Sequence, residues 1–154
     1  MLTTLLLMPV LLTHGPSQLR QTLDPSKATA LQRGEIIRCY KRGGLTPHGQ
    51  YQVLIAVTPK SIFLKTQTWS NSVRVTEGIW DAALSALRAT NEDALFSRPR
   101  EYKVPHSASD GTDIYITFRK GGKVVKWDTV RFDPPDRGFG LLTFLENIEF
   151  GRVP

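Results

Sequence analysis

Two runs of alternating apolar and polar residues meet at a Gly-Gly pair late in the chain, and this pattern predicts a β-hairpin. Gly121-Gly122 suits a two-residue turn in which both residues have a positive φ. Pairing outward from that turn gives three pairs on one face: Phe118 with Val125, Ile116 with Trp127, and Ile114 with Thr129. That face is apolar and the opposite one is polar, as in an antiparallel sheet that is covered on one side.

The rest of the pattern predicts four more strands and two helices. The strand candidates are residues 36–41, 51–58, 61–67 and 72–75, and residues 42–49 form the first loop. Thr76 is a suitable N-cap for the first helix. The helices carry apolar stripes with helical spacing: Trp80, Ala83, Leu84 and Leu87 in one, and Leu141, Leu142, Leu145 and Ile148 in the other.

This order of elements predicts an α+β fold. We expect an antiparallel sheet of about five to six strands with two helices packed on one face. The other face would remain open to a partner. A single α+β domain is expected over residues 35–154, preceded by a polar linker or short helix at 17–34.

Residues 1–16 differ from the rest of the chain, because residues 2–12 are almost wholly apolar. The run is too short to cross a bilayer as a helix, so no transmembrane span is predicted. Its length is typical of the apolar part of a signal peptide, although no Lys or Arg precedes it. Two alternatives stay open: a secreted or periplasmic protein with a cleaved signal, or a cytoplasmic protein with an apolar N-terminus.

The chain is basic, with a net charge of +6 and a sequence pI near 9.7. This balance favours acidic partners, but the Lys and Arg residues are scattered rather than clustered. A nucleic-acid interface is the alternative to a protein partner. Tyr115 and Arg119 would lie on the polar face of the hairpin, where sheet proteins that bind RNA carry two or three aromatic residues.

Catalytic and cofactor signatures are weak. Cys39 is the only cysteine, and its place in a strand favours a small buried side chain over a nucleophile. The spacing of the three histidines fits no zinc motif, and no phosphate or dinucleotide loop is present. The prediction is therefore a protein without a cofactor or metal, and not an enzyme. The alternative is a small hydrolase that uses His106 with Asp110 or Asp113.

The order of elements from the segment Arg42-Gly43-Gly44-Leu45 to the closing apolar helix resembles the emfourin-type inhibitors of thermolysin-like metalloproteases. These are small α+β proteins with a Ser-Gly-Gly-Phe-like segment near their start. The resemblance covers about residues 35–148 in pattern, with Arg-Gly-Gly-Leu in place of that segment and with longer connections. It implies a protease-binding role and assigns no inhibitory residue here.

The combined prediction is a non-catalytic module that binds another macromolecule, as an exported inhibitor or an immunity-type protein would. Loops carry binding residues on rigid scaffolds, so residues 43–49 and 98–110 are the expected contact regions. The candidate partner-binding residues are Arg42, Leu45, His48, Arg98, Arg100, His106, Tyr115 and Arg119.

Overall fold

The computed structural model describes residues 23–46, 49–92, 112–132 and 140–152. The strands are β1 (Ile37–Thr46), β2 (Gly49–Val57), β3 (Ser61–Thr66), β4 (Ser70–Arg74), β5 (Thr112–Lys120) and β6 (Lys123–Phe132). The helices are α1 (Pro25–Ala28), α2 (Glu77–Ala89) and α4 (Gly140–Glu149). None of the helices in these ranges is long and apolar enough to span a membrane.

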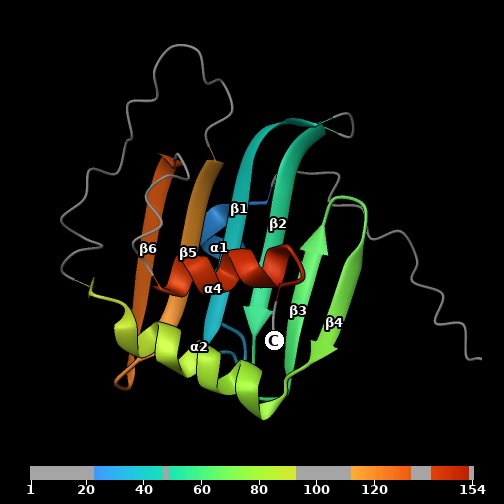
Figure 1. Ribbon diagram of the computed structural model, residues 1–154. Helices are drawn as coiled ribbons and strands as arrows, with labels where there is room; N and C mark the ends of the chain where they lie inside the picture. Colours follow the sequence, from blue (N-terminus) through green and yellow to red (C-terminus); the bar gives the residue numbers. More distant parts are fainter. Residues whose placement is uncertain (1–22, 47–48, 93–111, 133–139, 153–154) are drawn as a thin grey trace, which may run out of the picture.

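The six strands form one antiparallel sheet in the order β4-β3-β2-β1-β5-β6 (Figure 1). Strands β1 to β4 follow one another as neighbours, and the β5–β6 hairpin joins them through β1. The α+β class and the antiparallel sheet predicted from the sequence are confirmed. Strands β4 and β6 are the two edges of this sheet.

The β5–β6 hairpin has the predicted register. Phe118 pairs with Val125 and Ile116 with Trp127, and the turn glycines Gly121 and Gly122 have φ values of 55° and 78°. Such positive φ values favour glycine because a side chain would clash with the backbone. A shift of one residue would move every apolar side chain to the polar face, so the pattern specifies the pairing.

One buried cluster joins α2 and α4 to the apolar side of the sheet. Figure 1 shows both helices in front of that side. The stripe on α2 differs from the predicted one. Trp80 and Leu84 are only half-buried, and the buried residues are Ile79, Ala83, Ala86 and Leu87. The alanines carry little bulk, so α2 can approach its neighbours closely, and the larger Trp80 lies at the margin.

The opposite face of the sheet is not open along its whole length. Tyr40 and Leu54 form a second buried cluster with Ala28 of α1, and Thr117 is 1% exposed. The expectation of helices on a single face is therefore incomplete, because the short helix α1 lies behind the sheet (Figure 1). The predicted free face is wrong at these positions, because the segment before β1 folds back over them.

β1 is longer than predicted. Most of the loop expected at 42–49 is strand, since β1 extends to Thr46 and β2 begins at Gly49. The register shifts between Gly43 and Leu45, which marks a β-bulge. Glycine tolerates the backbone of a bulge, so Gly43-Gly44 interrupts the ladder without ending the strand. The predicted contact region 43–49 is thus largely a strand pair.

Candidate functional site

Two of the predicted binding residues, Arg42 and Tyr115, lie together on neighbouring strands. β1 pairs with β5 so that Arg42 is opposite Asp113. Arg42 donates from Nε to Oδ2 of Asp113 (3.1 Å) and from Nη2 to the Tyr115 hydroxyl (3.2 Å). Its guanidinium carbon also lies 5.5 Å from the centre of the Tyr115 ring. The cationic side chain is therefore held by its own neighbours.

The same cluster continues inward to Tyr40. The rings of Tyr40 and Tyr115 are stacked with centroids 6.2 Å apart, and the Tyr40 hydroxyl donates to Oε1 of Gln52 (2.9 Å). Burial raises the pKa of both tyrosines, and Arg42 opposes the shift. Burial also works against the charge of Arg42, but the hydrogen bond to Asp113 leads the effects that raise its pKa.

This cluster does not form the stacking surface that a sheet needs to bind RNA. Tyr40 is wholly buried and Tyr115 is half-buried, so the pair offers no two open ring faces. Arg119 is exposed, and its Nε donates to the backbone oxygen of Glu35 (3.3 Å). The geometry in the described ranges favours a structural role for Arg42 and Tyr115 over a nucleic-acid interface.

The side chains of the other predicted partner-binding residues lie outside the described residues. Leu45 lies in β1 opposite Gln50, but its side chain is outside the described residues. The remaining predicted residues all lie outside the described ranges: His48, Arg98, Arg100, His106 and Asp110. Asp113, the alternative partner of His106, forms the ion pair with Arg42. The enzyme hypothesis and the loop hypothesis stay predictions.

An apolar groove lies at the β4 edge of the sheet, beneath α2 and α4. We call it the edge groove. Its volume is about 400 Å³, within the range of about 300–1,000 Å³ that ligand pockets occupy. The apolar lining residues are Ile62, Leu64, Trp69, Val73, Ile79 and Ile148. Polar atoms at its margin come from Asn71, Arg74, Thr76 and Glu149.

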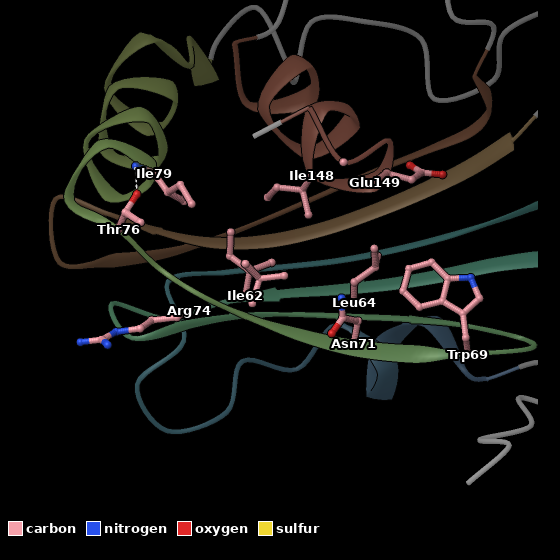
Figure 2. Close-up of a pocket in the computed structure, with 11 residues that line it drawn as sticks. Ile62, Leu64, Trp69, Asn71, Arg74, Thr76, Ile79, Ile148 and Glu149 are labelled. Atoms are coloured by element: carbon pink, nitrogen blue, oxygen red, sulfur yellow. Dashed lines mark hydrogen bonds between the residues drawn. The ribbon is translucent and has the colours of Figure 1, made fainter. Parts of the chain in front are cut away.

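Pairing of β3 with β4 places the lining residues on the side of the sheet that carries α2 and α4. Ile62 is opposite Val73 and Leu64 is opposite Asn71. Figure 2 shows Ile62, Leu64 and Trp69 directed toward the helices, with Ile148 pointing down from α4 and Arg74 directed away from the apolar side chains. Antiparallel partners share a face, so one short hairpin supplies the floor of the groove.

The outer part of the edge groove is unusually exposed for apolar residues. Trp69 and Val73 are 44% and 47% exposed, whereas Ile62 and Ile148 are 2% and 5% exposed. The α2 end of the groove is held by the Thr76 cap, whose hydroxyl accepts from the Ile79 N–H (3.3 Å). A tryptophan that leads from solvent into an apolar hollow is the composition expected at binding surfaces.

A second, more polar hollow of about 470 Å³ lies on the other side of α4. It is lined in part by Lys41 and Glu149, whose charged groups are 2.7 Å apart and whose side chains are 8% and 9% exposed. Each charge neutralises the other, so the pair anchors α4 to β1. The described ranges contain no cluster of three or more His, Cys, Asp and Glu residues that could hold a metal.

Cys39 is wholly buried, as its strand position predicted, and burial raises its pKa to about 12. The folded thiol therefore keeps its proton where an unfolded one, with an ordinary value of 9.0, ionises. The contribution of this thiol to the free energy of unfolding is therefore fully present below pH 9 and is lost as the pH rises from 9 toward 12.

We expect iodoacetamide to leave Cys39 unlabelled in the native protein at pH 8 and to label it in denaturant. Equal labelling rates in the two states would contradict this burial.

No protein-family model matches the sequence, and a search of curated proteins found none similar to it. Sequence reasoning missed Trp69 and Val73 because a groove made by four elements has no local signature. The sequence did contain one signal, which is the tryptophan in the otherwise polar stretch 66–72. No neighbouring apolar residue in that stretch can bury its side chain.

Proposed function

We propose that this protein is a non-catalytic protein-binding module whose edge groove holds apolar side chains of a partner protein. The observation that carries the proposal is the pairing of a deep apolar floor with the exposed Trp69 and Val73 at its outer rim. Burial of such an apolar rim against a partner lowers the free energy, because the apolar surface is removed from water. The groove carries few polar groups that could act on a substrate, which favours binding over catalysis.

The proposal takes α2 and α4 to be two helices packed together over one face, with the edge groove at their common margin. An inhibitor or immunity-type protein is its most concrete form. The resemblance in element order to emfourin-type inhibitors supports that form. The apolar run within residues 1–16 has the length found in signal peptides, which supports export. Under this proposal the partner is an extracellular or periplasmic protein.

Two matched substitutions test the proposal. Val73 in β4 and Val124 in β6 both lie on edge strands, and they are 47% and 49% exposed. Val73→Lys places a charge at the groove, whereas Val124→Lys places the same charge at the far edge. Since both sites are exposed, each change should alter stability by less than about 0.5 kcal/mol.

The wild-type chain and both variants are immobilised and exposed to extract and culture medium of the source cells. We expect a protein that is retained by wild type and Val124→Lys and lost by Val73→Lys. The purified partner should then bind Val73→Lys at least about tenfold more weakly, as expected when a charge replaces an apolar contact. The proposal is wrong if no protein shows this pattern, or if the purified partner binds all three chains equally.

A further inference from the structure

Within the described ranges no strand pairs with the outer side of β4, and the pairing of β4 with β3 determines which of its backbone groups face outward. The Thr66 N–H donates to the Trp69 oxygen (2.8 Å), and the Val75 N–H donates to the Lys60 oxygen (3.0 Å). Hydrogen-bonded pairs alternate along an antiparallel ladder. Asn71 and Val73 therefore bond to β3. The alternate residues of β4 present their N–H and C=O groups to the outside: Ser70, Ser72 and Arg74.

The middle one of these three donors is already occupied. The Ser72 N–H donates to Oδ1 of Asn71 (2.8 Å). This contact between adjacent residues covers the centre of the edge and leaves the donors of Ser70 and Arg74 facing outward. It confirms that the Ser72 N–H is directed away from β3.

The two edges of the sheet differ in their charge. β6 carries four charged residues, Lys123, Lys126, Asp128 and Arg131, and charges on an edge discourage pairing with another strand. β4 has the sequence Ser-Asn-Ser-Val-Arg, with a single charge at its end. Strand addition is thus opposed at β6 and is open at β4, beside the edge groove.

We propose that an extended segment of the partner protein adds to the sheet as a seventh strand beside β4, with apolar and acidic side chains in alternation. The inference rests on the proposed protein-binding function. Because side chains of a strand alternate between faces, every second one would enter the edge groove beside Val73 and Trp69. Those positions require apolar residues.

The acidic character follows from the other face. The side chain of Arg74 shares that face with Lys65 of β3, since both lie at alternate positions to the groove residues. The chain as a whole carries a net charge of +6. Glu or Asp at the intervening positions of the added strand would therefore meet cations. β4 has only five residues, so backbone bonds alone are few and the groove must supply the remaining affinity.

The test uses a capped peptide of alternating Val and Glu, about six residues long as in a usual strand, with the full chain. Amide hydrogen exchange reports directly on the outward donors. We expect the peptide to slow exchange at Ser70 and Arg74 by at least about tenfold, while Asn71 and Val73 change little because β3 already protects them. A backbone N-methylated form and a Val-Lys peptide should each bind at least about tenfold more weakly.

Asn71→Ala gives a gain-of-function variant. Removal of the amide frees the Ser72 N–H for the added strand, so the Val-Glu peptide should bind about three- to tenfold more tightly, the worth of one net hydrogen bond. Ser72→Ala is the matched control because it removes an exposed hydroxyl and keeps the N–H covered. Its affinity should equal that of wild type.

Several results would overturn strand addition. Absence of binding by the Val-Glu peptide, or equal binding by the Val-Lys peptide, rejects the stated chemistry. Peptide binding that leaves exchange at Ser70 and Arg74 unchanged rejects the pairing but leaves the groove as a binding site. Protection that rises with the concentration of the protein alone assigns this edge to a second copy of the chain. The proposed function is tested separately: it fails if the partner protein binds Val73→Lys as tightly as it binds wild type.

Discussion

Replacing Lys41 with methionine should lower the free energy of unfolding by about 3–5 kcal/mol. The Lys41 ammonium is 2.7 Å from the Glu149 carboxylate, and both side chains are more than nine-tenths buried. The substitution leaves the Glu149 charge in the interior without its partner, and its desolvation is no longer offset. Urea unfolding followed by circular dichroism measures the loss.

The double variant Lys41→Met with Glu149→Leu is the informative control. It removes both charges and fills the site with apolar atoms, so its stability should return to within about 1 kcal/mol of wild type or exceed it. A single variant as stable as wild type would mean that the pair is solvated and contributes nothing to anchoring α4.

Phe118→Ala should have an effect of similar size for a different reason. Phe118 is fully buried in β5, opposite Val125 and beside β1. Its truncation would leave a cavity and lower the free energy of unfolding by about 3–5 kcal/mol. Phe150 is 64% exposed, so Phe150→Ala should cost less than about 1 kcal/mol, including its contact with the Arg152 guanidinium. Chemical denaturation distinguishes the two. Similar losses for both variants would contradict the assigned core.

The parts of the fold that local pattern controls were predictable. The register of β5 with β6 follows from strict alternation and from Gly121-Gly122, and the start of α2 follows from Thr76. Each of these depends on residues that are close in the chain. The face of α2 was harder, because Trp80 has more apolar surface than Ala83 but packs less deeply. Hydrophobicity alone does not measure how closely two elements approach.

The sites depended on contacts that no local pattern contains. Arg42 and Tyr115 were both selected from the sequence, but their mutual contact requires the pairing of β1 with β5. The same pairing brings the Asp113 carboxylate to the Arg42 guanidinium. The edge groove needs β3, β4, α2 and α4 at once, so the place of Trp69 in a polar stretch did not by itself locate the groove.

The position of β1 has a consequence for how the chain reaches this structure. β1 to β4 are connected by short turns, but β1 also bonds to β5, which follows α2 and a long connection. Closing that larger loop costs more conformational entropy than forming any of the hairpins. During synthesis β1 has no second neighbour until β5 leaves the ribosome. The edge of β1 that carries Cys39 and Tyr40 then lacks its second strand partner, and such unpaired edges with apolar side chains promote aggregation during folding.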